Sequence, residues 1–312
     1  MPCMGPHELP DAARRASLGL VVGLLAIASN ACTSGSSLRS SDTPSGPIRV
    51  VAAENLYGDI VAQIGGSRVT VTSILSDPNA DPHLFEPGTT TGAAVADAQL
   101  VIENGLGYDS FMQRLLDASP DANRKVITVA DVLHITASDA NPHLWYDLPR
   151  IPQVASAIGT SLAALDPAGA SYFRARVAAF DSSLTPIDDA IAKIKANYAD
   201  APVAYTEPVP GYLLMAAHLR VLTPASFALA IEEGNEPTPQ DVAAMQDLFT
   251  SSQVSVLLYN SQATSPITEQ LLALARRTSV PVVPVTETLP PGMSFQSWQL
   301  GQIRALAGAL GG

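Results

Sequence analysis

The sequence predicts an α/β protein built from two similar halves, each a parallel sheet flanked by helices. Short β-branched runs alternate with amphipathic segments over residues 48–129, and the alternation resumes over residues 203–310. A helical stretch of about thirty residues lies between the two regions. Repeated strand–helix units favour parallel strands, because each helix returns the chain to the starting edge of the sheet.

The first half contains predicted strands and helices in alternation, identified from β-branched runs and from apolar residues at helical spacing. The strands are expected at residues 48–53, 68–75, 100–103 and 125–129. The helices are expected at residues 56–64, 89–98, 109–118 and 151–165. Gly65-Gly66 ends the first of these helices and Asp166-Pro167 ends the last, since both pairs disfavour further helical turns.

The second half repeats this alternation without repeating the sequence. Its strands are expected at residues 203–206, 254–259 and 282–286. Its helices are expected at residues 211–218, 238–251, 267–278 and 295–310. The stretch between the halves, residues 168–198, would be about 45 Å long as one continuous helix. Pro186 lies inside it and lacks the N–H of a helical hydrogen bond, so we expect a kink or a division there.

The composition indicates globular domains and disfavours nucleic acid as a partner. Of the 312 residues, 47% are hydrophobic and 15% are charged, which is enough apolar material for real cores. The formal charge is -12, and residues 1–31 contain two basic and two acidic residues, so their removal leaves it at -12. Such a chain repels phosphate backbones and mildly attracts cations.

The N-terminus has the pattern of an export signal. Arg14-Arg15 precedes an apolar run over residues 18–28, which is too short to span a bilayer. Cys32 follows and resembles the lipidated cysteine of a bacterial lipoprotein, although Ser29 stands where those signals usually carry leucine. We therefore expect a signal peptide over residues 1–31, a lipid on Cys32 and a flexible tether over residues 32–47, which would anchor the exported protein at the outer face of the cell membrane. A plain signal peptide with an incidental cysteine stays open.

Two histidines occur in nearly the same sequence motif. His83 follows Asp81-Pro82, and His143 follows Asn141-Pro142; each is succeeded by leucine and an aromatic residue. The proline ring restricts its own backbone and that of the preceding residue, so each histidine follows a segment of restricted conformation. Histidines on a restricted backbone are suited to metal binding, whereas a single Pro-His pair is more often a turn with a surface histidine. The repetition favours a metal site.

Two predicted strands of the second half run directly into acidic residues, Glu207 and Glu287. Ligands of open parallel sheets bind at the carboxyl ends of the strands, where a cleft between the halves would also face the two histidines. Two neutral imidazoles and two carboxylates balance the charge of a divalent cation. A threonine-glutamate pair at a strand end is also common as a cap or a solvated pair.

These motifs together resemble the metal-binding solute-binding lipoproteins of bacterial ABC importers for zinc and manganese. The likeness covers about residues 48 to 300 and rests on Asp81-Pro82-His83, Asn141-Pro142-His143, Thr206-Glu207-Pro208, the segment 232–239, and Val285-Thr286-Glu287-Thr288-Leu289. The resemblance implies two α/β lobes joined by a long rigid helix, here an N-terminal lobe over residues 48–166, a linking helix over residues 167–199 and a C-terminal lobe over residues 200–312.

The resemblance also implies the site and the partners. It places one Zn²⁺ or Mn²⁺ between the lobes of a monomer that delivers the ion to an ABC permease. Its four ligands would be His83, His143, Glu207 and Glu287. The fourth ligand is commonly aspartate in the family, and the third is often histidine in zinc carriers and glutamate in manganese carriers. Because carboxylates favour manganese and the general affinity order favours zinc, the choice of ion stays open.

Four further residues are weighed against ordinary roles. Glu232 and Glu233 are candidates to accept a hydrogen bond from a ligand imidazole, although acidic residues before a helix start at Thr238 are ordinarily capping and solvated. His134 and His218 are expected to be surface or packing residues.

Two alternative functions compete with metal transport. A secreted mononuclear metallohydrolase would use similar ligands, but it would keep an open coordination position, and the sequence has no His-Glu-x-x-His motif. A receptor for an organic metal chelate would need aromatic or arginine side chains in the cleft, and aromatic residues make up only 5% of the chain. The sequence therefore favours a binding protein over an enzyme.

Overall fold

The computed structural model describes residues 46–79, 82–136 and 140–311. The predicted signal peptide, Cys32 and nearly all of the predicted tether lie outside the described residues. Within those ranges, none of the helices combines the length and the hydropathy needed to cross a bilayer.

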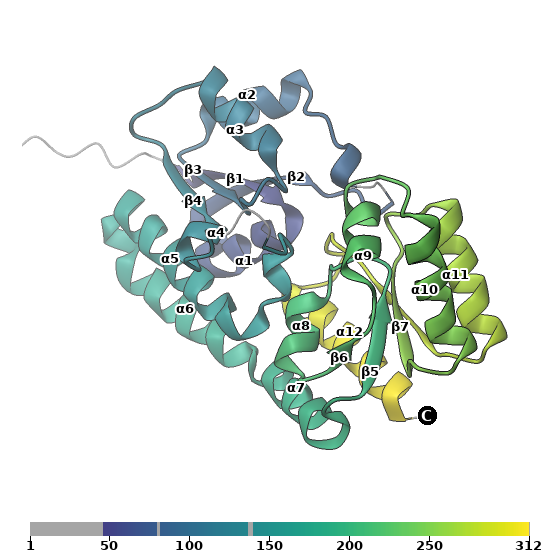
Figure 1. The fold of residues 1–312 in the computed structure, drawn as a ribbon. Helices are drawn as coiled ribbons and strands as arrows, with labels where there is room; N and C mark the ends of the chain where they lie inside the picture. Colours follow the sequence, from purple (N-terminus) through teal and green to yellow (C-terminus); the bar gives the residue numbers. More distant parts are fainter. Residues whose placement is uncertain (1–45, 80–81, 137–139, 312) are drawn as a thin grey trace, which may run out of the picture. The chain divides into compact units, whose positions relative to one another are not determined.

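The first sheet has four parallel strands in the order β2-β1-β3-β4 (Figure 1). Its strands are β1 (Ile48–Glu54), β2 (Val69–Leu75), β3 (Leu100–Glu103) and β4 (Lys125–Thr128). The helices of this region are α1 (Asn55–Gly65), α2 (Thr89–Asp97), α3 (Ser110–Ala118), α4 (Val129–Val132) and α5 (Ile151–Leu165). All four residues of β3 are buried, as expected for a central strand covered on both faces.

The second sheet has the same topology, with its parallel strands in the order β6-β5-β7-β8. Its strands are β5 (Pro202–Tyr205), β6 (Arg220–Val221), β7 (Val256–Asn260) and β8 (Val282–Val285). The helices of this region are α8 (Gly211–Ala216), α9 (Ala225–Glu232), α10 (Pro239–Thr250), α11 (Pro266–Arg277) and α12 (Phe295–Gly311). The predicted fold class, two parallel sheets flanked by helices, is confirmed.

Short 3-10 helices complete the described chain. They are η1 (Gly66–Arg68), η2 (Pro82–Leu84), η3 (Leu144–Tyr146), η4 (Leu148–Arg150) and η5 (Pro167–Gly169). Two of them lie at the paired motifs: η2 contains His83, and η3 begins directly after His143.

The predicted strands and helices lie within two residues of the observed ones, but the sequence analysis missed β6, α4 and α9. β6 is only two residues long and pairs only with β5, so it has no recognisable period. α9 is eight residues long, and its buried side chains Phe227, Ala228 and Ile231 do have helical spacing. The spacing of these three residues could have predicted α9. This helix is relevant to the site because its last residue is Glu232.

The stretch between the two sheets is one long bent element, and the kink or division expected near Pro186 is confirmed. It consists of α6 (Ala170–Ser183) and α7 (Thr185–Tyr198), which meet at Leu184. Pro186 stands in the first turn of α7, where the missing N–H costs no helical hydrogen bond. Leu184 keeps helical backbone angles, φ -82° and ψ -15°, so the two helices form one bent element.

The two sheet regions contact each other directly as well as through this bent element. Asn55, the first residue of α1, exchanges two hydrogen bonds of 2.8 Å with the backbone N–H and carbonyl of Leu289. Asp59 accepts a hydrogen bond from the backbone N–H of Phe295, at the start of α12. Since the chain between these partners contains the whole second sheet, both contacts hold the segment after β8 against α1.

Candidate metal centre

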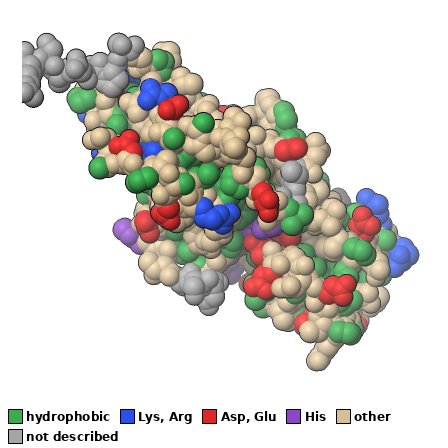
Figure 2. Space-filling view, turned by 90° about the horizontal axis from the view of Figure 1, so that it is seen from above, with side chains coloured by type: hydrophobic (Ala, Val, Ile, Leu, Met, Phe, Trp, Pro, Cys, Tyr) green, Lys and Arg blue, Asp and Glu red, His purple; other side chains and the backbone are tan. Residues whose placement is uncertain are grey.

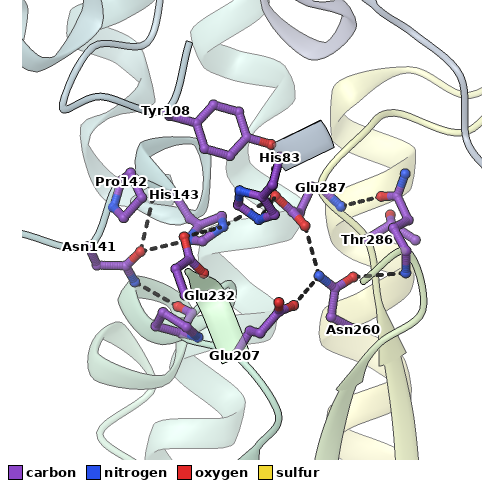
Figure 3. A network of polar contacts seen from close by, with 12 residues as sticks. His83, Tyr108, Asn141, Pro142, His143, Glu207, Glu232, Asn260, Thr286 and Glu287 are labelled. Atoms are coloured by element: carbon purple, nitrogen blue, oxygen red, sulfur yellow. Dashed lines mark hydrogen bonds and ion pairs between the residues drawn. The ribbon is translucent and has the colours of Figure 1, made fainter. Parts of the chain in front are cut away.

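The four residues predicted as metal ligands come from loops that leave the sheets at the carboxyl ends of strands or that carry a Pro-His motif. His83 follows β2, Glu207 follows β5 and Glu287 follows β8. His143 stands between α4 and η3. Figure 3 shows the side chains of these four residues gathered in one place. In open parallel sheets this is the edge where ligands bind, because the helices diverge there and leave a crevice.

The structure brings these side chains together around Glu287 and His83. The Oε2 atom of Glu287 lies 3.3 Å from His143 Nε2 and 3.5 Å from His83 Nε2. Potential ligand atoms of His83, His143 and Glu287 all lie within 4.8 Å of one another. Those of His83, Glu207 and Glu232 satisfy the same limit, so His83 links the two groups.

The cluster is buried on most sides. His143 and Glu287 are fully buried, Glu207 is 1% exposed, and the side chains of Glu232 and His83 are 11% and 23% exposed. On the face shown in Figure 2, acidic side chains border a recess in which histidine is visible. Solvent therefore reaches the cluster mainly on the side of His83.

The buried charges shift the protonation of His143. Burial alone lowers the pKa of this imidazole, but the charge of Glu232, the hydrogen bond with Glu287 and the charge of Glu287 outweigh burial and raise the pKa above its ordinary value of 6.5. The carboxylates therefore stabilise the protonated, positively charged imidazole, as they would stabilise a metal cation.

Glu287 shows the opposite shift. Burial raises its pKa, but the hydrogen bond and charge of His143, the charge of His83 and the hydrogen bond from Tyr108 together lower the pKa to about 2. This carboxylate therefore stays ionised throughout the physiological pH range.

Asn141 orients the imidazole of His143. The amide nitrogen of Asn141 donates to the carbonyl of Pro208 at 2.6 Å, which leaves its Oδ1 facing His143 Nδ1 at 2.7 Å. Because an amide oxygen can only accept, Nδ1 carries the proton. In the neutral ring the lone pair is then on Nε2, the nitrogen that faces Glu287.

Two further residues donate hydrogen bonds to the clustered carboxylates, and sequence reasoning missed both. Asn260 Nδ2 donates to Glu287 Oε1 at 2.7 Å and also to Glu207 Oε2. Tyr108 donates its hydroxyl proton to Glu287 Oε2 at 2.8 Å. Asn260 is the last residue of β7, and Tyr108 follows β3. The strand-end rule that singled out Glu207 and Glu287 could have found them.

Of the other residues considered in the sequence, one lies in the cluster and three lie outside it. Glu232 lies in the cluster, with Oε1 3.7 Å from His143 Nε2. Glu233 is exposed, and its carboxylate accepts a hydrogen bond from the side chain of Asn235, so the geometry gives it no part in orienting an imidazole. His134 and His218 are exposed, as expected.

The arrangement is chemically suited to a cation. It joins two imidazoles, which bind transition metals when neutral, with three carboxylates, two of which, Glu207 and Glu287, accept hydrogen bonds from Asn260 or Tyr108. A bound cation would neutralise the buried charges.

Comparisons with known proteins agree with this chemistry. A family model described as zinc-uptake complex component A, periplasmic, matches residues 50–309. The manganese-binding lipoprotein MntA of Halalkalibacterium halodurans is 27% identical over 178 residues, which cover 56% of this chain and 58% of that relative. The metal ABC transporter substrate-binding lipoprotein FimA of Streptococcus parasanguinis is 23% identical over 282 residues, which cover 85% of each chain. The periplasmic zinc-binding protein TroA from Treponema pallidum superposes with a TM-score of 0.72 at 18% identity, over 85% of this chain and 99% of that one, which shows a shared fold.

Proposed function

The chain belongs to the family of zinc-uptake complex component A, periplasmic, and on this premise we propose that it is the extracytoplasmic solute-binding component of an ABC importer. It captures one divalent transition metal ion and delivers it to a membrane permease. The observation that carries this proposal is the convergence of imidazole and carboxylate donors, far apart in sequence, into two groups that share His83 and within each of which the ligand atoms lie within 4.8 Å of one another.

The proposed ligands are His83, His143, Glu207 and Glu287. Their neutral imidazoles and two carboxylates compensate a divalent charge, and the hydrogen bonds from Asn260 hold both carboxylates in place. Imidazole and carboxylate together suit both Zn²⁺ and Mn²⁺. The relatives named above are a manganese-binding and a metal-transporter protein, which supports a cation of this class.

Transport is favoured over catalysis. The relatives are named as substrate-binding and metal-binding lipoproteins, and nothing in the site favours the metallohydrolase alternative. Four protein ligands would also leave little room for a reactive water on a tetrahedral ion. The same names support lipidation of Cys32 and anchoring at the outer face of the cell membrane as part of the proposal.

Native mass spectrometry of the purified chain tests this function. Titration with Zn²⁺ or Mn²⁺ should give a single adduct of one ion per chain, without any organic chelator. Failure of both ions to bind, or binding only in the presence of a chelator, would refute the proposal. Turnover of generic ester or phosphoester substrates by the metal-loaded chain would instead support the metallohydrolase hypothesis.

Metal affinity should fall as the pH is lowered, and the fall should begin above pH 6.5. The reason is that His143 must be neutral to bind a metal, and its pKa in the metal-free protein is raised above that ordinary value. Glu287 contributes nothing to this change, because its pKa is about 2. Competition against a chelator whose own protonation is known, at steps between about pH 5.5 and 8.5, measures the effect. An affinity that is constant over this range would contradict the assignment.

Replacing Asn141 by alanine should weaken metal binding by about 10–100-fold, the usual effect of removing a residue that orients a ligand. The substitution removes the acceptor that holds the Nδ1–H of His143. Asn141→Asp keeps that acceptor and should recover most of the affinity. Isothermal titration of both variants makes the comparison. Both variants lose the hydrogen bond to the carbonyl of Pro208, so equal losses would show that this bond, and not the contact with Nδ1, supports metal binding.

A further inference from the structure

A third carboxylate, Glu232, lies in the metal cluster. Its Oε1 is 3.7 Å from His143 Nε2, and its ligand atoms lie within 4.8 Å of those of His83 and Glu207. Figure 3 shows it beside the imidazole of His143, between that ring and Glu207. The sequence suggested only that Glu232 could orient a ligand imidazole from outside.

The geometry excludes that outer role at His143. A residue that orients a ligand imidazole accepts from the ring nitrogen that does not bind the metal. On His143 that nitrogen is Nδ1, and it is already held by Asn141 at 2.7 Å. Glu232 faces Nε2 instead, the nitrogen that also faces Glu287. It therefore stands on the side of the ring where the ion would bind.

The backbone around Glu232 fixes this position. Glu232 is the last residue of α9, and Phe227, Ala228 and Ile231 bury the same helix in the hydrophobic core of the second sheet region. Gly234 turns the chain away directly afterwards with φ at 69°. The carboxylate thus projects from the end of an anchored helix and not from a free loop.

From these contacts we infer that Glu232 is a fifth protein ligand of the metal ion and that it makes the site prefer Mn²⁺ over Zn²⁺. This inference rests on the proposed function and deepens it. Structural Zn²⁺ sites are typically tetrahedral with four donors, whereas carboxylates and water in an octahedral arrangement suit Mn²⁺. A fifth, oxygen donor therefore adds more to the binding of Mn²⁺ than to that of Zn²⁺.

The surroundings can accommodate the extra charge. Three carboxylates leave one negative charge in excess over a divalent ion, and the hydrogen bonds from Asn260 and Tyr108 disperse that charge.

The test compares Glu232→Gln with its neighbour Glu233→Gln. The two variants remove the same charge one residue apart, but Glu233 is exposed and lies outside the cluster. Competition against a metal-sensitive dye at one fixed pH gives the affinities for Mn²⁺ and Zn²⁺. E232Q should lose at least about 10-fold in Mn²⁺ affinity, the lower end of the loss known for residues that only support a ligand. Its Zn²⁺ affinity should stay within about 3-fold, and E233Q should match the unmodified chain.

Other outcomes overturn the inference. Unchanged Mn²⁺ affinity in E232Q would show that Glu232 does not bind the ion, and equal losses for both ions would show that it does not select between them. The electron paramagnetic resonance spectrum of bound Mn²⁺ adds a direct readout, because loss of a ligand changes its line shape in E232Q and not in E233Q. If the unmodified chain bound neither ion, the proposed function itself would fail; normal binding with an unaffected E232Q would refute only the fifth ligand.

Discussion

Replacing His83 and His143 together by alanine is expected to abolish stoichiometric metal binding. Both imidazoles lie within 3.5 Å of the same oxygen of Glu287, so the double variant leaves only carboxylates in the cluster. Removing a residue that merely supports a ligand already costs about 10–100-fold in affinity, so the loss of two ligands should exceed ~100-fold. Native mass spectrometry measures the stoichiometry, and titration measures the affinity.

The matched control replaces His134 and His218, two exposed histidines outside the cluster, by asparagine. Both have positive φ, 54° and 57°, which asparagine tolerates better than alanine. This variant should bind one ion per chain with unchanged affinity. Circular dichroism must show that the His83→Ala, His143→Ala chain is folded, because His143 is fully buried. A folded double variant that still bound one ion tightly would show that the ion binds elsewhere.

Replacing Asn260 by aspartate is expected to destabilise the metal-free protein by about 3 kcal/mol or more, the cost of an uncompensated buried charge. Asn260 is 1% exposed, and its amide nitrogen donates to both Glu207 and Glu287. The substitution preserves the shape of the side chain and its acceptor oxygen for the N–H of Gln262, but it puts a third carboxylate between two others. The loss should shrink as the pH falls, because protonation of one carboxyl restores a hydrogen-bond donor.

Urea unfolding of the metal-free chain at several pH values measures this effect. Asn235→Asp is the control, because Asn235 donates to Glu233 at 3.1 Å in the same kind of asparagine–glutamate contact, but on the surface. Its free energy of unfolding should change by no more than about 0.5 kcal/mol. Equal stability of the two variants would mean that Glu207 and Glu287 do not depend on the amide of Asn260.

Local patterns predicted most of the fold. The bounds of β3 and α5 were predicted to the residue, because a short apolar run ends at polar residues in one case and a proline follows the periodic segment in the other. The errors occurred where local signals are weak. β6 has only two residues, and α9 is an eight-residue helix close to prolines and acidic residues, a segment for which no helix was predicted.

The candidate site was predicted in part. Pro-His motifs and strand ends singled out His83, His143, Glu207 and Glu287, and the structure brings these four side chains together, while their role as ligands stays a prediction. Of the two candidate acceptors, Glu233 is exposed and accepts from Asn235, while Glu232 faces Nε2 of His143; their part in holding a ligand imidazole stays a prediction. Adjacent residues on the chain cannot be told apart by composition when only one of them points into the cluster.

The sequence by itself determined the alternation of strands and helices, the division near Pro186 and the residue types available to a cation. These features depend on neighbouring residues and on periods of two and 3.6, which can be read along one segment. Only the tertiary structure decided that Asn260 and Tyr108 donate to the carboxylates and that Glu232 faces Nε2 of His143. Such contacts join side chains from different strands and helices, so they depend on how two sheets pack and not on any local pattern.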